Sequence, residues 1–552
     1  MKKMYNVASL NNFRQLINIS SKKYSSKTAF LLREKDGRYR KIKYIDFRQR
    51  YYNLCSYFIS QGLKGKYIAV VGNNCYEWTL AYLAAASVGI VVPLDKELSV
   101  EDIDNFLNHA QVSAVCGDEK ILSKVAFELR TPRKYFSFDA IDCEYSLIPC
   151  QDESEIDSIA ISKDDTNILI FTSGTTGSAK GVCLSQHNVL SDIRSTLSVV
   201  NIKSGDRTLS ILPLHHTYEC TLNCILMLSR GACITYCDSL LKVAKNIVEY
   251  SPSILVVVPA LLKMLDKKIR QSVSEKCPNK YRHYFDDYAF AEAIGKLPLF
   301  VRKVISSKVA KSLGGNVRLF IVGAADLDSA IVDNFEALGM RVLQGYGLTE
   351  CAPLLAGNSD FYFNSKSTGI AIPGVQLKID EPNDEGIGEI LAKGDNIMLG
   401  YFKDEEATNA AFKDGWFRTG DLGRMDADGA LYIAGRIKNV IVTENGKNIY
   451  PEELEARLSD FPEVGDVLVV ASQERGKTEV KARIFPNIDV IKKKLGHMPS
   501  LSDIKHALGR IVSDINAKMP GYKRISNYEV LDCALEKTTT CKIKRFGKNI
   551  NK

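Results

Sequence analysis

A loop between residues 172 and 181 carries the hydrogen-bond donors needed to hold a polyphosphate. The residues that give it this capacity are Thr172, Ser173, Gly174, Thr175, Thr176, Gly177 and Lys180. Glycines let the backbone approach a ligand closely, and successive amide groups in such a turn can converge on an anion. The spacing is not that of a Walker A loop, in which the lysine directly follows a glycine and precedes Ser or Thr. Phosphate binding is therefore the predicted role, and a plain flexible loop of small residues is the alternative.

A second segment, Leu343–Glu350, combines an aromatic ring, a hydroxyl group and a carboxylate. Tyr346 offers a ring that can stack on adenine, next to the small Gly347. Thr349 offers a hydroxyl group to a phosphate. Glu350 offers a hard oxygen ligand to Mg²⁺, which proteins bind through one or two carboxylates plus substrate phosphates. The alternative is an ordinary strand followed by a turn and a helix cap.

Asp421 and Arg436 are predicted to contact a ribose. Asp421 stands among glycines in Gly415–Gly423, where its carboxylate can accept hydrogen bonds from both ribose hydroxyls. A charged acceptor strengthens such bonds. Arg436 is a predicted ribose or phosphate contact. Thr-Gly-Asp is also ordinary turn chemistry, so a turn between two strands is the alternative.

Two further places could border a ligand. His215 and His216 follow an apolar stretch in a chain that has only 7 His, and a solvated pair at a strand end is the alternative. Gly323 and Ala324 form a turn after the apolar segment Val317–Val322. Small residues there permit a ligand to lie across the backbone, although a tight strand-to-helix turn explains them almost as well.

These segments, in this order, resemble the motifs of the adenylate-forming (AMP-binding) superfamily, which includes acyl-CoA synthetases, luciferases and peptide-synthetase adenylation domains. The resemblance spans Phe171 to Arg545 and is closest to bacterial long-chain fatty acyl-CoA synthetases. It includes Glu536–Phe546, which is similar to the final lysine motif of the family. There Cys541 stands where glycine is common, which puts the backbone conformation of that loop in question.

The resemblance implies an ATP-dependent acid–thiol ligase for medium- or long-chain fatty acids. The carboxylate attacks the α-phosphorus of ATP to give an acyl-adenylate and pyrophosphate, and the thiol of CoA then displaces AMP. ATP, Mg²⁺ and CoA are the implied cofactors and co-substrates, with Glu350 as the metal ligand. His216 would lie between the adenylate and acyl sites, while Gly323 and Ala324 would border adenine and the acyl group. An acyl–acyl-carrier-protein ligase and a non-catalytic adenylate-binding homologue are the alternatives.

Three more residues receive roles from the resemblance. Lys438 occupies the hinge position, where the chain passes into a small C-terminal domain. Gly446 belongs to the loop that swings against the active site for the thioester step. Lys542 is the catalytic lysine, which acts with Thr349 and Glu350 during adenylation.

The strands and helices expected around these residues are typical of an α/β protein. Strands such as Tyr67–Val71 alternate with helical stretches such as Trp78–Val88, which predicts parallel βαβ units. The resemblance implies a large N-terminal α/β domain of the adenylate-forming type over residues 1–437, which binds ATP and the acyl group. A small mobile α+β lid domain with the catalytic lysine is expected over residues 438–552.

Composition restricts the class of protein. The chain has 552 residues, 45% of them hydrophobic, and a formal net charge of +8, which is modest and gives no argument for nucleic acid. It suits an anionic ligand or weak peripheral contact with an anionic membrane. The 14 Cys include no C-x-x-C pair, and the Cys220 and Cys224 spacing that zinc sites can use lies in an apolar stretch that favours buried thiols. This cysteine usage leads us to expect a reducing, cytoplasmic location. We also expect no signal peptide and no transmembrane helix. Either a monomer or a homodimer is compatible with the sequence.

Overall fold

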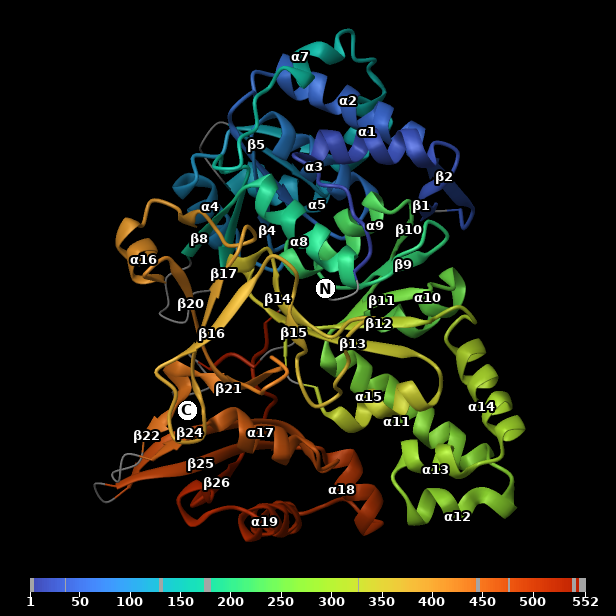
Figure 1. Ribbon diagram of the computed structural model, residues 1–552, viewed down its shortest axis with the longest axis vertical. Helices are drawn as coiled ribbons and strands as arrows, with labels where there is room; N and C mark the ends of the chain where they lie inside the picture. The colour runs from blue at the N-terminus through green and yellow to red at the C-terminus, as the bar shows by residue number, and fades with distance from the viewer. Residues whose placement is uncertain are drawn as a thin grey trace. The chain divides into compact units, whose positions relative to one another are not determined.

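The structure is a computed structural model that describes residues 4–34, 36–128, 133–172, 180–325, 327–442, 447–474, 477–538 and 543–545. The chain divides into two compact units (Figure 1). The first unit comprises Met1–Leu377 and Ala392–Phe417, and the second comprises Lys378–Leu391 and Arg418–Lys552. Each unit is thus assembled from two separate stretches of the chain. The predicted boundary between residues 437 and 438 concerns a hinge and stays a prediction.

The larger sheet of the first unit has a parallel centre and antiparallel edges. Its strand order is β15-β14-β13-β12-β11-β9-β10-β1-β2. From β13 to β1 neighbouring strands are parallel, and the pairs β13–β14, β14–β15 and β1–β2 are antiparallel. The strands are β1 (Thr28–Arg33), β2 (Tyr39–Lys43), β9 (Arg207–Ser210), β10 (Cys233–Tyr236), β11 (Ile254–Val257), β12 (Leu319–Val322), β13 (Arg341–Gly347), β14 (Leu354–Gly357) and β15 (Ile370–Ala371).

A second sheet in the same unit has the order β18-β8-β7-β4-β3-β5-β6. Its strands are β3 (Tyr67–Val71), β4 (Ile90–Leu94), β5 (Ala114–Gly117), β6 (Lys134–Ser137), β7 (Ile168–Thr172), β8 (Lys180–Leu184) and β18 (Gly400–Tyr401). The predicted strand Tyr67–Val71 is β3, and the predicted helical stretch Trp78–Val88 lies within a helix of this layer.

Strands β11 and β12 of the larger sheet are apolar at every position because both of their faces are buried. In β11, Leu255 and Val257 belong to one apolar cluster, and Ile254 and Val256 belong to another. Successive residues of a strand point to opposite faces, and a strand buried on both faces reads as a continuous apolar run. The helices of the first unit are α1 (Phe13–Tyr24), α2 (Tyr44–Ser60), α3 (Tyr76–Val88), α4 (Val100–His109), α5 (Glu119–Glu128), α6 (Phe138–Cys143), α7 (Glu153–Asp157), α8 (Gln186–Val199), α9 (Leu226–Ser229), α10 (Val243–Tyr250), α11 (Pro259–Lys276), α12 (Asn279–Asp287), α13 (Phe290–Lys296), α14 (Leu299–Ser312), α15 (Ser329–Ala337) and α16 (Glu405–Ala410).

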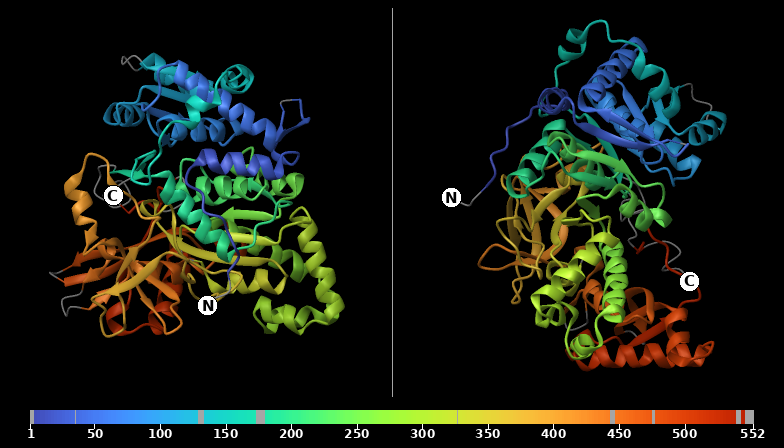
Figure 2. Two further views of the ribbon diagram at one scale, coloured as in Figure 1. Left: turned by 45° about the horizontal axis from the view of Figure 1, so that its top comes forward. Right: turned by 90° about the vertical axis from the view of Figure 1, so that its right-hand side faces the viewer.

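Two helical features depart from the simple α/β plan. Helices α11 to α14 follow one another between β11 and β12 and gather at one end of the first unit (Figure 2). Residues Tyr218–Ile225, just before α9, form a π-helix, a rare geometry often found near functional sites.

The second unit has an α+β core of its own. In its sheet β24 (Val464–Glu474) pairs antiparallel with β25 (Lys477–Pro486), which pairs in parallel with β26 (Asn527–Val530). The apolar core of this unit is formed by these strands with helices α17 (Pro451–Ser459), α18 (Ile488–Leu495) and α19 (Leu501–Ala517). The antiparallel pair β20 (Trp416–Met425) and β21 (Leu431–Arg436) precedes this core in the chain. A large α/β part and a smaller α+β part are what the sequence predicted.

The cysteines of the described residues are free thiols. Most are buried or partly buried, whereas Cys143 in the first unit and Cys533 in the second are exposed. Cys220 and Cys224 are buried, as their apolar surroundings predicted. Among the helices that the structure describes, none is long and apolar enough to cross a membrane.

Candidate active site

The predicted phosphate loop joins two paired strands. Thr172 ends β7 and Lys180 begins β8, and the two residues lie opposite each other in the antiparallel register. The Thr172 hydroxyl donates a hydrogen bond to the Lys180 carbonyl at 3.3 Å. The structure therefore defines the base of the loop. The predicted residues between these ends, Ser173, Gly174, Thr175, Thr176 and Gly177, lie outside the described residues.

One tyrosine connects this base to the predicted metal ligand. The Lys180 ammonium lies 4.6 Å from the centre of the Tyr401 ring, within the range of a cation–π contact. The Tyr401 hydroxyl donates to Oε1 of Glu350 at 3.0 Å. Burial, and then the charge of Glu350 and its hydrogen bond, raise the pKa of Tyr401, so the phenol stays protonated and acts as a donor. Lys180 and Glu350, 170 positions apart, are thus joined through one side chain.

The backbone around Tyr401 is held on both sides. On one side, β18 pairs antiparallel with β8, with Tyr401 opposite Val182. On the other, the Met398 amide donates to the Glu350 carbonyl at 2.8 Å. The side chain of Asn188, near the start of α8, donates to the carbonyl groups of Asp395 and Ile397 at 2.8 and 2.9 Å. These contacts fix the segment that carries Tyr401 against both predicted motifs.

Glu350 lies in a short 3₁₀ turn, Thr349–Cys351, directly after β13. Tyr346 and Gly347 are in the last part of β13, opposite β14. A Cβ atom at Gly347 would lie 1.8 Å from the Pro353 carbonyl oxygen, so only glycine fits where the chain folds back on itself. This close turn brings the hydroxyl of Thr349 and the carboxylate of Glu350 to the end of the strand that bears Tyr346.

The Glu350 carboxylate fits a Mg²⁺ ion that is also bound by substrate phosphates. It is partly exposed, and the Tyr401 hydroxyl orients one of its two oxygens. Among the described residues no group of three or more His, Cys, Asp or Glu side chains could hold a metal ion. A single carboxylate completed by phosphate oxygens and water is nevertheless the usual arrangement for Mg²⁺.

The turn after β12 contains Gly323 and Ala324. A Cβ atom at Gly323 would lie 3.1 Å from the ring of Tyr218, whose hydroxyl donates to the carbonyl groups of Val257 and Ile321 at 3.1 and 3.0 Å. Ala324 has φ of +76°, a left-handed conformation that residues other than glycine rarely adopt. Backbone strain of this kind is concentrated at functional sites.

His215 and His216 follow β9, and their rings lie 4.1 Å apart. Burial, and to a smaller extent the charge of Lys96, lower the pKa of His215 to about 4. The 3.6 Å separation of His215 Nε2 from Asp95 is therefore not an ion pair at neutral pH, because burial of the ring outweighs the carboxylate. The imidazole of His215 is therefore neutral at neutral pH. The side chain of His216 also interacts with a neighbouring group.

Three of the four predicted motifs of the first unit follow strands of the larger sheet, at one of its edges. Strands β9, β11, β12 and β13 lie next to one another in this order (Figure 1) and are parallel, so their carboxyl ends share an edge. The histidines follow β9, the Gly323 turn follows β12 and the Tyr346–Glu350 motif ends β13. Ligands of open α/β sheets bind at this edge.

A buried carboxyl group next to the histidines was missed from the sequence. Glu219 lies in the π-helix and is 0% exposed, and its Oε1 accepts a hydrogen bond from Asn223 at 2.7 Å. Burial raises the pKa of Glu219 to about 8, although hydrogen bonds from Ser210 and Asn223 lower it. Glu219 is therefore mostly protonated at neutral pH. The signal in the sequence was a lone carboxylate in an apolar stretch.

In the second unit, the two predicted ribose contacts touch each other. Asp421 on β20 faces Arg436 on β21, and Oδ1 of Asp421 lies 2.9 Å from Nε of Arg436. The Thr419 hydroxyl accepts from the Asp421 amide at 3.1 Å and donates to the Ile390 carbonyl at 2.8 Å. Asp421 is only 5% exposed, so its carboxylate is held in one orientation.

Of the three remaining predicted residues, Lys438 belongs to the described part of the chain. Lys438 is exposed in the 3₁₀ turn Ile437–Asn439, directly after Arg436. Gly446 and Lys542 lie outside the described residues. Tyr401 was also missed, because its role depends on the pairing of β18 with β8, which no local pattern announces.

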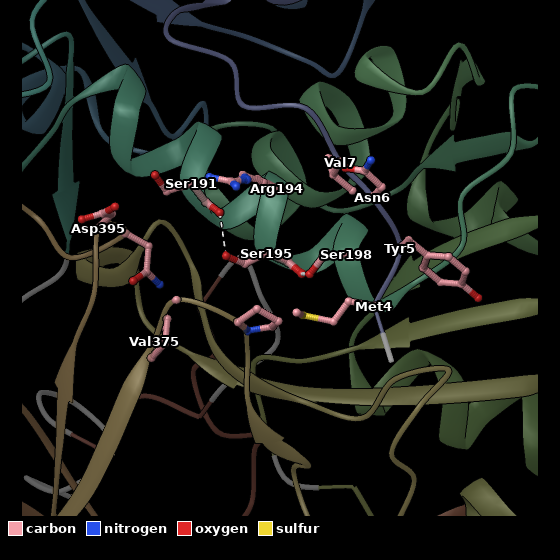
Figure 3. Close-up of a pocket in the computed structure, with 13 residues that line it drawn as sticks. Met4, Tyr5, Asn6, Val7, Ser191, Arg194, Ser195, Ser198, Val375 and Asp395 are labelled. Atoms are coloured by element: carbon pink, nitrogen blue, oxygen red, sulfur yellow. Dashed lines mark hydrogen bonds between the residues drawn. The ribbon is translucent and has the colours of Figure 1, made fainter. Parts of the chain in front are cut away.

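The first unit also contains a hollow, shown in Figure 3. It has a volume of about 310 Å³ and lies between the N-terminal segment around Tyr5, helix α8 and the turn at Pro373–Val375. The Tyr5 amide donates to the Ser198 carbonyl at 2.8 Å, which holds the N-terminal segment along the helix. No residue of the predicted motifs lines this hollow, so it is not the site that they form.

The decisive comparison is with a family of known enzymes. The model of the family described as "AMP-binding enzyme" matches residues 18–402. The chain belongs to this family. The predicted identification and the prediction of an adenylate-forming enzyme are thereby confirmed.

Curated relatives of this AMP-binding enzyme include ligases with fatty acids in their names. Long-chain-fatty-acid--CoA ligase FadD15 of Mycobacterium bovis is 27% identical over 442 residues, which cover 75% of this chain and 72% of that protein. Long-chain-fatty-acid--CoA ligase 5 of Mus musculus is 28% identical, with 76% and 67% covered. Fatty acyl-CoA synthetase B of Dictyostelium discoideum is 27% identical, with 88% and 78% covered.

Solved structures share the fold of this AMP-binding enzyme over nearly its whole length. ATP-bound MatB from Rhodopseudomonas palustris has a TM-score of 0.74 at 21% identity, with 97% of each chain covered. O-succinylbenzoate coenzyme A synthetase from Bacillus subtilis, in complex with AMP, has a TM-score of 0.73 at 21% identity, with 98% of each chain covered. The predicted fold class is confirmed.

Proposed function

We propose that this AMP-binding enzyme is an ATP-dependent acid–thiol ligase that activates a medium- or long-chain fatty acid and transfers it to CoA. One observation carries the proposal beyond family membership: the contact from Lys180 through Tyr401 to Glu350. It joins the base of a loop suited to phosphates to a carboxylate suited to a cation. An enzyme that handles a nucleoside triphosphate needs these two features side by side.

In the first step, the residues of the first unit hold ATP and the acid in line. Lys180 and the loop that it ends bind the β- and γ-phosphates, which leave as pyrophosphate, and Thr349 binds a phosphate oxygen. Mg²⁺ on Glu350 would offset the negative charge that separates carboxylate from triphosphate. Tyr346 stacks on adenine beside Gly323 and Ala324. Positioning of this kind supplies much of the rate of such reactions.

Asp421 and Arg436 are proposed to bind the ribose. The contact with Arg436 orients the Asp421 carboxylate, and a charged acceptor forms strong hydrogen bonds with hydroxyl groups. His216 follows β9 at the same sheet edge and is proposed to contribute to the boundary between the adenylate and acyl sites.

The second unit is proposed to act as a lid that rotates about Lys438. Lys542 contacts the reacting phosphate during adenylation and then withdraws, while the loop that contains Gly446 moves in for the thioester step. A closing lid would also keep water from the acyl-adenylate until the thiol arrives.

The nature of the acid and of the acceptor is proposed from the relatives. Their names specify long-chain fatty acids and CoA, and the cysteine usage suits a cytoplasmic enzyme of lipid metabolism. Transfer to an acyl carrier protein is the second outcome that the experiment must separate.

The test is acid-dependent release of pyrophosphate from ATP and Mg²⁺, measured with acids of rising chain length, with aryl acids, and with CoA or a carrier protein as acceptor. Turnover that peaks with a fatty acid and requires CoA supports the proposal. Turnover only with carrier protein moves the assignment to a carrier-protein ligase. If no acid leads to pyrophosphate release, the proposal is overturned. Cys541→Gly, which restores the glycine common in the family, would then be the first variant to measure.

The role of Lys542 is tested by separating the two half-reactions. Lys542→Ala is expected to lose adenylate formation far more than thioester formation from a supplied acyl-adenylate. Equal loss in both half-reactions would remove the assignment. Wild-type enzyme measured on the same supplied adenylate is the reference.

A further inference from the structure

A buried carboxyl group lies on helix α8, which follows β8, the strand that begins at Lys180. Asp192 of this helix is 0% exposed. Its Oδ1 accepts a hydrogen bond from the Leu354 amide at 3.2 Å. Leu354 begins β14, directly after the turn that carries Thr349 and Glu350. Asp192 therefore holds the end of that turn from the side of α8.

An asparagine holds the same turn through a second set of contacts. Asn396 is 2% exposed, and its side-chain amide donates to the carbonyl groups of Cys351 and Leu354 at 3.0 and 2.6 Å. Both amide hydrogens are thereby used, which fixes the orientation of the side chain and leaves its Oδ1 as an acceptor. Two residues further along the chain, the Met398 amide donates to the Glu350 carbonyl.

Two buried oxygen atoms at this place lack a hydrogen-bond partner among the described residues. They are Oδ2 of Asp192 and Oδ1 of Asn396. Burial raises the pKa of Asp192 well above its ordinary value of 3.8, and the Leu354 amide and a contact with the Asn396 side chain lower it only in part. A neutral carboxyl group has one hydroxyl donor. A hydrogen bond from that hydroxyl to Asn396 would satisfy both oxygen atoms.

We propose that Asp192 and Asn396 are positioning residues that hold the turn of Thr349 and Glu350, and that the neutral carboxyl group of Asp192 donates a hydrogen bond to Asn396. The catalytic part of this inference rests on the proposed ligase activity. Both residues act through the backbone that follows Glu350. Loss of their contacts would let the turn shift, and the carboxylate that is proposed to hold Mg²⁺ would shift with it.

Helix α8 extends this arrangement toward the loop suited to phosphates. Asn188 lies one helical turn before Asp192, and residues four apart share a face of a helix. The side chain of Asn188 donates to the carbonyl groups on either side of Asn396. One face of the helix after β8 thus fixes both the segment that contains Asn396 and the turn that contains Glu350.

The first test is hydrogen–deuterium exchange of the full chain in wild type, Asp192→Asn and Asp192→Leu. Asparagine has the shape of aspartic acid and keeps an acceptor for the Leu354 amide and a donor for Asn396, whereas leucine has neither. In Asp192→Leu we expect about tenfold faster exchange in peptides that cover residues 348–356. In Asp192→Asn the same peptides should exchange as in wild type.

The matched control is Asn334→Leu. Asn334 is also buried, and its side chain donates to Asp266 at 2.9 Å elsewhere in the first unit, so exchange over residues 348–356 should stay as in wild type. Unchanged exchange in Asp192→Leu overturns the positioning role. Equally fast exchange in Asp192→Asn and Asp192→Leu overturns the neutral donor. If the leucine variant does not fold, Asp192→Asn decides alone: wild-type exchange supports the inference, and faster exchange overturns it.

The second test detects the proton on Asp192. The infrared difference spectrum between wild type and Asp192→Asn at neutral pH should contain the carbonyl band of a protonated carboxyl group. Glu219→Gln, measured in the same way, provides the reference for a second buried carboxyl group with a raised pKa. Bands of an ionised carboxylate in the Asp192→Asn difference spectrum would overturn the proposed hydrogen bond.

The third test measures adenylate formation over a range of Mg²⁺ concentrations. Asp192→Leu and Asn396→Leu should each lower kcat/KM about tenfold and need more Mg²⁺ for half-maximal rate, whereas Asp192→Asn should do neither. An unchanged Mg²⁺ requirement in both leucine variants, or impairment of Asp192→Asn as severe as that of Asp192→Leu, contradicts the inference. Wild-type enzyme that forms no adenylate would overturn the proposed function, and the exchange and infrared experiments would still decide the contacts of Asp192.

Discussion

The most direct test of the site concerns a single hydroxyl group. Tyr401→Phe removes the hydrogen bond to Glu350 at 3.0 Å and keeps the ring that faces Lys180 at 4.6 Å. A hydrogen bond to a charged group contributes about 1.5 to 3 kcal/mol, and the partial exposure of Glu350 places this one near the lower end. A loss of about 1.5 kcal/mol corresponds to about a tenfold lower kcat/KM.

The assay is acid-dependent exchange of pyrophosphate into ATP, measured over a range of Mg²⁺ concentrations. Because the hydroxyl orients a proposed metal ligand, Tyr401→Phe should need more Mg²⁺ for half-maximal rate as well as being slower. Tyr39→Phe is the control, since Tyr39 donates to Glu249 at 2.6 Å elsewhere in the first unit. An unchanged rate and Mg²⁺ requirement in Tyr401→Phe would refute the reasoning. A slower enzyme with an unchanged Mg²⁺ requirement would refute the metal-orienting role.

Three further changes probe other parts of the molecule. Burial raises the pKa of Glu219 from 4.5 to about 8, so its contribution to the free energy of unfolding is fully present below pH 4.5 and falls by about 1.4 kcal/mol per pH unit until pH 8. Glu219→Gln should therefore be less sensitive to pH than wild type over this range. Melting temperatures of the two proteins that change in parallel from pH 5 to 8 would contradict this prediction. Asp421→Asn removes the charged acceptor and should weaken AMP binding about tenfold by calorimetry; an unchanged Kd argues against a ribose contact. Lys438→Pro should block the thioester step and spare adenylation, and an unaffected thioester rate would exclude the hinge role.

Much of the sheet architecture follows from local patterns. The apolar run Tyr67–Val71 is β3 with the same bounds, and the helical pattern over Trp78–Val88 lies within α3. Both elements are almost entirely buried, and a continuous apolar run bounded by polar residues is a clear sequence signal for a buried element. The π-helix at Tyr218–Ile225 was not predicted, because its i→i+5 hydrogen bonds are accompanied by tertiary contacts, such as those of the Tyr218 hydroxyl with Val257 and Ile321, that no local pattern specifies.

The proximity of site residues is easiest to predict where the motif is continuous in sequence. Tyr346, Gly347 and Glu350 lie on one strand and its turn, so their proximity follows from chain connectivity. Tyr401 joins the site through strand pairing across more than 200 residues, which neither spacing nor residue type reveals. The same limit explains why the assignment of Lys378–Leu391 to the second unit was not anticipated.

The two exposed thiols described above make the proposed rotation of the second unit open to direct measurement. Cys143 belongs to the first unit and Cys533 to the second, and both are exposed. After replacement of Cys541 by serine, a donor and an acceptor dye on these two native cysteines would report the separation of the units by energy transfer in single molecules. Recording that separation with ATP, with acyl-adenylate and with CoA would turn a proposed rotation into a measured sequence of distances.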